Sequence, residues 1–201
     1  MGSSGWERNK ARTRVALATA AVRLFREQGY DATTVEDIAR AAGSSSSTFF
    51  RYFGAKEDVL FFNIREVLDR FRDFVSHPIP GLTSWDQIHL GVVTAVAQVA
   101  EPSAEIEEAS IMSWLNEPAI SRRFGQFSGE LEQIIAAALA RERGVAPERD
   151  LTVQVRARCA TAAYMSAFYI HVNTGCELAK LLDEAFRTIE DGIQPRNRAT
   201  T

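Results

Sequence analysis

Apolar residues recur at helical spacing along almost the whole of this 201-residue chain. In residues 9–29, for example, Val15, Ala18, Val22 and Phe25 stand three or four positions apart and so share one face of an α-helix. No segment alternates convincingly between apolar and polar residues with the period of two that a half-buried strand shows. The pattern therefore predicts an all-α fold of about nine helices.

Glycine and proline divide this pattern into segments, because both residues interrupt regular helices. We expect the helices at about residues 9–29, 34–42, 45–52, 56–76, 85–100, 103–116, 118–143, 150–174 and 176–192. The connector HPIPGLTS, residues 77–84, is the best candidate for a domain boundary. The expected organisation is a first domain over 1–55, a connecting helix over 56–76, a second domain over 77–194 and a disordered tail over 195–201.

The stretch AGSSSSTFF, residues 42–50, places four serines and a threonine directly before two phenylalanines. One serine would be enough to cap a helix, so the others suggest that this helix end meets a polar partner from outside. The helices expected on either side are joined by a short turn at Gly43 and Ser44. Two helices joined in this way, the second polar at its N-terminus, form a helix-turn-helix whose second helix enters the major groove of DNA.

The charge distribution agrees with a nucleic-acid partner, although the net charge of −3 does not. Residues 1–56 carry nine lysines and arginines against five acidic residues, whereas residues 57–201 carry fourteen against twenty-one. A basic end on an acidic body is typical of proteins that bind polyanions. The alternative is that the basic residues simply form a solvated arm.

Other classes of function find little support. No apolar run approaches a membrane span, and the start MGSSGWERNK shows no secretory signal. Cys159 and Cys176 form neither a disulfide framework nor a metal spacing, which favours a reducing cytoplasm. No zinc-binding, phosphate-loop or nucleophile motif is present, so we assign no catalytic residue, no metal site and no cofactor.

Residues 24–60, LFREQGYDATTVEDIARAAGSSSSTFFRYFGAKEDVL, resemble the DNA-binding domain of the TetR family of bacterial repressors. The spacing from Gly29-Tyr30 through Thr34, Ala42-Gly43 and Thr48 to Lys56 carries the resemblance. The family implies a three-helix head that binds double-stranded operator DNA, a connecting helix and a ligand-binding domain, in a homodimer. It also implies regulation of transcription, usually repression, and no enzymatic activity.

The resemblance also implies which residues contact DNA. They include basic residues of the N-terminal arm, the cap of the second helix, the groove face of the third and the start of the fourth: Arg12, Arg14, Thr34, Ser45, Ser46, Ser47, Thr48, Phe50, Arg51, Tyr52 and Lys56. Phe50 stands where the family commonly has tyrosine, and it can either pack or touch a thymine methyl group. Ser44 also departs from the family, which usually has an apolar residue after the glycine. Because the groove face lacks Gln, Asn and a bidentate arginine, we expect DNA shape, water bridges, Arg51 and the arm to contribute to specificity.

The second half is similar to the effector domain of a TetR subgroup linked to acyl-coenzyme A-like ligands, including regulators of the mycofactocin type. The stretches NEPAI and ERGVAPERDL carry this resemblance. It implies a small apolar effector, such as an acyl-CoA. The candidate ligand-binding residues are Trp85, Trp114, Leu115, Phe124, Phe127, Tyr164, Phe168, Tyr169 and His171, with Arg122, Arg123, Arg156 and Arg158 as candidate anion partners. The alternative is that the aromatic residues are core and the arginines are a solvated face.

In this family the last two helices of each subunit form the dimer interface, here residues 150–174 and 176–192. Their apolar positions support this assignment: Val153, Val155, Ala160, Ala163, Ala167, Leu178, Leu181, Leu182 and Ile189. The alternative is that these residues fill the core of one subunit. A ligand-responsive dimeric regulator is the leading hypothesis, against an enzyme or an effector-binding protein that has lost DNA binding.

Overall fold

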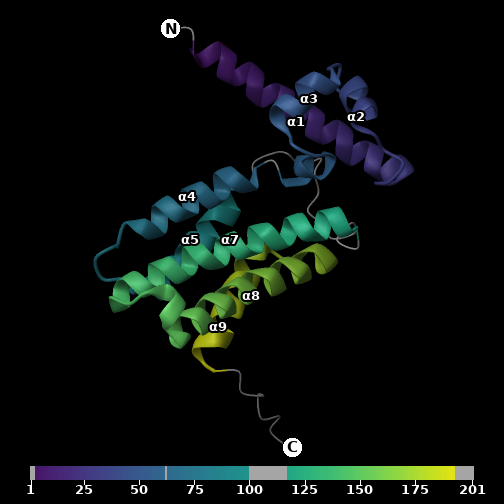
Figure 1. Cartoon of the computed structure of the whole chain (residues 1–201). Coiled ribbons are helices and arrows are strands. Elements are labelled where there is room, and N and C mark those ends of the chain that lie inside the picture. The colour runs from purple at the N-terminus through teal and green to yellow at the C-terminus, as the bar shows by residue number, and fades with distance from the viewer. Residues whose placement is uncertain (1–2, 62, 100–116, 193–201) are drawn as a thin grey trace, which may run out of the picture. The chain divides into compact units, whose positions relative to one another are not determined.

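A computed structural model describes residues 3–61, 63–99 and 117–192 of the chain, and all the regular elements in these residues are helices (Figure 1). They are α1 (Ser3–Gln28), α2 (Val35–Ala41), α3 (Ser46–Tyr52), the 3-10 helix η1 (Lys56–Phe61), α4 (Ile64–Ser76), α5 (Ser84–Val99), α7 (Pro118–Arg143), the 3-10 helix η2 (Pro147–Arg149), α8 (Leu151–Thr174) and α9 (Leu178–Glu190). The predicted all-α fold is confirmed. The helix expected over 103–116 and the tail over 195–201 lie outside the described residues.

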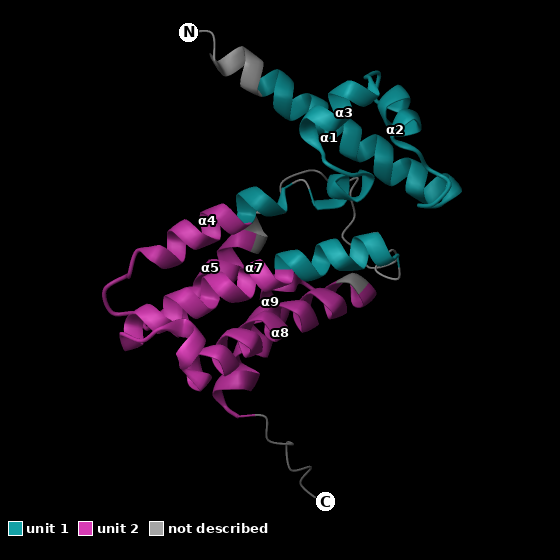
Figure 2. Ribbon diagram, viewed as in Figure 1, with its two compact units in different colours: residues 1–67, 99–127 teal, residues 68–98, 128–201 magenta. Residues whose placement is uncertain are grey.

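The chain forms two compact units (Figure 2). The first comprises residues 1–67 and 99–127, and the second comprises residues 68–98 and 128–201. The first unit thus contains the expected helix-turn-helix, and residues 118–127 at the beginning of α7 belong to it as well.

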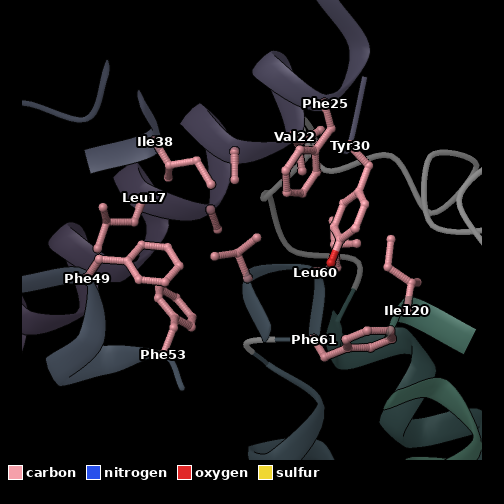
Figure 3. Packing of buried hydrophobic residues seen from close by; sticks show 13 residues of the cluster. Leu17, Val22, Phe25, Tyr30, Ile38, Phe49, Phe53, Leu60, Phe61 and Ile120 are labelled. Carbon is pink, nitrogen blue, oxygen red and sulfur yellow. The ribbon is translucent and has the colours of Figure 1, made fainter. Parts of the chain in front are cut away.

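The first unit has a core in which side chains from α1, α2, α3, η1 and the start of α7 meet (Figure 3). Phe49 of α3 is fully buried, with its ring centroid 5.3 Å from that of Phe53. Ile120 of α7 is also fully buried in this cluster, and Phe61 of η1 lies 5.2 Å from Phe127 between ring centroids. Phe49 and Phe53 therefore anchor α3 in this core, while the beginning of α7 packs against another part of it, near η1.

Two helices differ from the sequence-based expectation. The first begins at Ser3, whereas the sequence pattern favoured a helix from about residue 9. The helix expected over 56–76 is divided into η1 and α4. Val59, Leu60 and Phe61 are all buried, and three consecutive residues cannot share one face of an α-helix with 3.6 residues per turn. All three belong to the core of the first unit, so η1 is buried on several sides.

The second unit is a helical bundle in which α8 and α9 form a hairpin. Phe186 of α9 is fully buried between two side chains of α5: Trp85, at 5.2 Å between ring centroids, and His89, stacked at 4.5 Å. The indole of Trp85 donates a hydrogen bond to Glu190 (2.8 Å). Gly91 allows α4 and α5 to approach, because a Cβ atom there would lie 2.9 Å from the rings of Phe71 and Phe74.

Candidate DNA-binding surface

The helix-turn-helix begins with a complete capping box on α2. The Thr34 hydroxyl accepts a hydrogen bond from the Asp37 amide (3.1 Å), while the Asp37 carboxylate accepts bonds from the Thr34 hydroxyl (2.6 Å) and amide (3.2 Å). These bonds, led by that from the hydroxyl, hold the pKa of Asp37 below its usual range. The carboxylate therefore stays charged at neutral pH, which suits its place in the first turn of a helix. Thr34 itself is exposed.

The turn between α2 and α3 depends on Gly43, whose φ of +63° is a left-handed conformation that glycine adopts without strain. Ser45 then caps α3, because its hydroxyl accepts a bond from the Thr48 amide (3.2 Å). The same hydroxyl donates to the Thr48 side chain (3.0 Å). Ser45 and Thr48 thus organise the helix end, while Ser47 is exposed and Ser46 is half-exposed on its first turn.

The outward face of α3 consists of Ser47, Phe50 and Arg51, which are spaced at i, i+3 and i+4 and are all exposed. Phe50 retains 56% of its accessible surface. The guanidinium of Arg51 lies over the ring of Tyr52, 5.1 Å from its centroid. Together with the half-exposed Ser46, we call these three residues the outer face of α3. This outer face offers small hydroxyls, one apolar ring and one positive charge.

Lys56 was predicted to contact DNA, and the structure gives its ammonium two partners within the protein. It donates to the carbonyls of Tyr30 (2.6 Å) and Thr33 (3.1 Å) and lies 3.9 Å from the centroid of the Tyr30 ring. Burial, and then the nearby Glu57 carboxylate, raise the pKa of Tyr30, whose hydroxyl donates to Glu57 (3.1 Å). Lys56 therefore stabilises the turn between α1 and α2 through two of its three N–H donors.

The predicted basic arm is part of α1. Arg12 is exposed and its guanidinium donates to the Asn9 side chain (3.0 Å), whereas Arg14 is half-buried. Positions 12 and 14 are about 200° apart around a helix, so the two arginines face in different directions.

Asp58 is a residue that the sequence analysis did not single out. One of its carboxylate oxygens accepts bonds from the amides of Gly54 (3.0 Å) and Ala55 (3.1 Å), directly after α3. The other lies 2.8 Å from Nε of Arg123 on α7, in the geometry of an ion pair and not of a directed hydrogen bond. An aspartate three positions after a Gly-Ala break is a capping signal that could have identified it.

The candidate ligand-binding residues are distributed over both units. Phe124 and Phe127 belong to the first unit, where Phe127 packs against Phe61. In the second unit, Tyr164 and Phe168 are stacked at 6.0 Å between centroids, and His171 contacts the carbonyl of Cys176 (2.6 Å). Trp114 and Leu115 lie outside the described residues, while Trp85 and Tyr169 belong to the second unit.

Three of the four candidate anion partners already contact protein groups. Arg123 pairs with Asp58, Arg158 pairs with Glu132 (3.2 Å), and Arg156 lies over the ring of Trp85 at 4.8 Å. Arg122 is exposed on α7.

Within the described ranges, no group of three or more His, Cys, Asp or Glu side chains could hold a metal ion. No helix among the residues described is both long and apolar enough to span a bilayer.

Comparison with known proteins identifies the class of this protein. Residues 17–61 match the model of the bacterial regulatory proteins of the tetR family, and residues 82–194 match that of the MftR C-terminal domain. The chain belongs to the TetR family of DNA-binding transcriptional regulators, with a C-terminal domain of the MftR type.

Among its relatives is the transcriptional regulator HbdR of Aromatoleum sp. (strain CIB), which is 43% identical over 67 residues. That match covers 33% of this chain and only 29% of HbdR. The regulator TcmR of Streptomyces glaucescens is 27% identical over 202 residues, covering 94% of this chain and 86% of TcmR. The DNA-binding domain is therefore the part with the higher identity to these relatives, while the similarity to TcmR extends over both domains.

Solved structures show the same fold. The TetR-family repressor FadR of Thermus thermophilus, in complex with lauroyl-CoA, is 25% identical with a TM-score of 0.59, over 94% of this chain and 98% of that chain. FadR from Bacillus halodurans, a fatty acid degradation regulator, is 21% identical with a TM-score of 0.62, over 92% and 97% of the two chains. The second likeness concerns the fold alone.

Proposed function

We propose that the protein is a homodimeric repressor that binds a palindromic operator through α3 and is released from it by a small apolar effector. The observation that carries this proposal is the outer face of α3, which presents hydroxyls and Arg51 while Phe49 fixes the helix in the core. Hydroxyl groups and backbone amides at the N-terminus of a helix bind phosphate oxygens, and arginine adds charge. The proposed site on chromosomal DNA also implies a cytoplasmic location.

The proposed dimer interface lies on α8 and α9, but several of the positions named for it already lie in the core of one chain. Val153, Ala160, Ala163, Ala167, Leu178 and Leu182 are buried. The available surface is instead a stripe along α8 with Leu151 (78% exposed), Val155 (49%) and Tyr169 (55%), which also contains Arg158, paired with Glu132. These positions lie close to multiples of 3.6 residues apart, and such an exposed apolar stripe marks an interaction site.

A second copy of the chain fits this stripe. An isologous contact between identical helices would bury the α8 stripe of both subunits about one two-fold axis. The same symmetry would present two copies of α3, and binding in successive major grooves on one side of B-DNA requires the two copies to lie ~34 Å apart. A palindromic operator follows from that geometry.

For the effector we propose an acyl-CoA-like molecule, an apolar chain attached to an anionic head. Two findings support this class: the match to the MftR C-terminal domain, and the likeness to FadR of Thermus thermophilus, whose structure contains lauroyl-CoA. Within the second unit, the half-buried Tyr164 and the buried Phe168 are stacked and supply the kind of apolar lining that an acyl chain requires. Binding can release DNA only if the effector prefers the conformation that binds DNA poorly.

Arg51→Ala is expected to weaken DNA binding and reduce its dependence on salt. Each lost phosphate contact lowers the slope of log K against log salt by about 1, so the dimer should lose about 2. The probe is a duplex enriched by the wild-type protein from a random-sequence pool, and binding is followed by fluorescence anisotropy at several salt concentrations.

Arg23→Ala is the matched control, because Arg23 is an exposed arginine of the same unit that pairs with Glu27 on α1 (3.0 Å). It should leave the slope unchanged. An unchanged slope for Arg51→Ala would show that Arg51 does not contact a phosphate. If the wild-type protein enriches no duplex, the proposed binding of an operator is wrong.

Lauroyl-CoA is expected to release the same duplex from the wild-type protein at concentrations on the order of micromolar, as expected for a specific ligand. Coenzyme A alone tests the anionic head, and lauric acid tests the apolar chain. Release by lauroyl-CoA only would show that both parts bind. If all three leave the complex intact, the acyl-CoA class is wrong, although DNA binding stands.

A further inference from the structure

Phe50 is an unusual side chain for its position. It is the large apolar member of the outer face of α3, it is 56% exposed, and it shares that face with Ser46, Ser47 and Arg51. Exposure of an aromatic ring to water is unfavourable, and burial of the ring against another apolar group is favourable. Because α3 is the second helix of the helix-turn-helix, the helix that lies in the major groove in such motifs, the exposed ring indicates an apolar contact with DNA.

The ring is also held firmly. Phe50 packs edge to face against Phe49, with centroids 5.6 Å apart and planes at 84°. Phe49 is fully buried and packs in turn against Phe53, 5.3 Å away. A ring supported in this way loses little conformational freedom on binding, so more of the contact energy appears as affinity.

The chemistry of DNA limits what Phe50 can meet. Phenylalanine has no donor or acceptor, so it makes no hydrogen bond to a phosphate or to a base edge. In the major groove the base edges offer donors, acceptors and one apolar group, the C5-methyl of thymine. We propose that Phe50 reads a thymine in each half-site of the operator by contact with this methyl group; the inference rests on the proposed binding of operator DNA by α3.

The neighbours of Phe50 suit such a contact. Ser46 and Ser47 precede it by four and three positions, so both lie one turn away on the same face. Their small side chains let the helix approach the base edges, and serine itself discriminates poorly between bases. Phe50 therefore supplies specificity that the hydroxyl groups lack.

The test removes the methyl group from the DNA. A duplex enriched from a random-sequence pool by the full-length wild-type protein is resynthesised with 2′-deoxyuridine at each thymine position in turn, which keeps base pairing intact. At one position per half-site, the wild-type protein should lose about fourfold in affinity per methyl group, and about 15-fold when both half-sites are changed. Phe50→Ala should bind the thymine and uracil duplexes equally, within a factor of about 2.

Ser47→Ala is the matched control on the same face and should retain the preference for thymine, whatever its overall affinity. The comparison of thymine with uracil in the wild-type protein does not depend on any variant. It therefore still tests the contact if Phe50→Ala fails to fold. The inference is overturned alone if a duplex is enriched but no uracil position weakens wild-type binding, or if Phe50→Ala keeps the preference. If no duplex is enriched, the proposed operator binding and this contact fail together.

Discussion

Val155→Glu is expected to convert the dimer into monomers at concentrations at which the wild-type protein is dimeric. Val155 lies in the exposed apolar stripe of α8. In a two-fold interface the substitution occurs twice, and each carboxylate would be taken out of water without a partner. At about 2 kcal/mol for each copy, the dissociation constant of the dimer should rise about a thousandfold.

Sedimentation equilibrium over a range of protein concentrations measures this effect. Gln133→Glu is the control, because Gln133 is exposed on α7 and the change adds the same charge to the same unit. The control should remain dimeric, and it should bind DNA as the wild-type protein does. A Val155→Glu protein that stays dimeric would place the interface elsewhere than on the α8 stripe.

The helices were largely predictable from the sequence because apolar residues recur at helical spacing and glycine or proline interrupts the pattern between segments. The expected helices over 118–143 and 150–174 agree with α7 and α8 to within one residue at each end. The division of 56–76 was not predictable, because Val59, Leu60 and Phe61 are buried by contacts made in the folded unit. The start of α1 was missed because residues 1–5 carry no periodic pattern to mark a helix.

The candidate site was predictable in its residue types but not in its tertiary partners. The serine-rich start of α3 pointed to an N-cap, and Ser45 indeed caps the helix. In contrast, Lys56 bonds to carbonyls 26 and 23 residues earlier in the chain. Arg123, considered as an anion partner, pairs instead with Asp58, 65 positions before it. Contacts of this length depend on the fold and leave no local pattern.

The ion pair of Asp58 and Arg123 leads to the second large effect. Asp58→Ala is expected to lower the free energy of unfolding of the first unit by about 3 kcal/mol. The carboxylate is only 16% exposed, and its loss removes the acceptor of the Gly54 and Ala55 amides as well as the partner of Arg123. Chemical denaturation followed by circular dichroism measures the change.

Asp58→Asn separates the two contributions, because the amide keeps an oxygen for the backbone amides and loses the charge that pairs with Arg123. Its cost should fall between those of the wild type and Asp58→Ala. A double-mutant cycle with Arg123→Ala isolates the ion pair, and a coupling near zero would show that Asp58 acts through the backbone alone. Gly54 and Ala55 follow Phe53, the C-cap residue of α3, so Asp58→Ala should also weaken DNA binding at temperatures where the variant is still folded. If affinity is retained there, the turn after α3 does not position the helix on DNA, and the pair with α7 serves stability only.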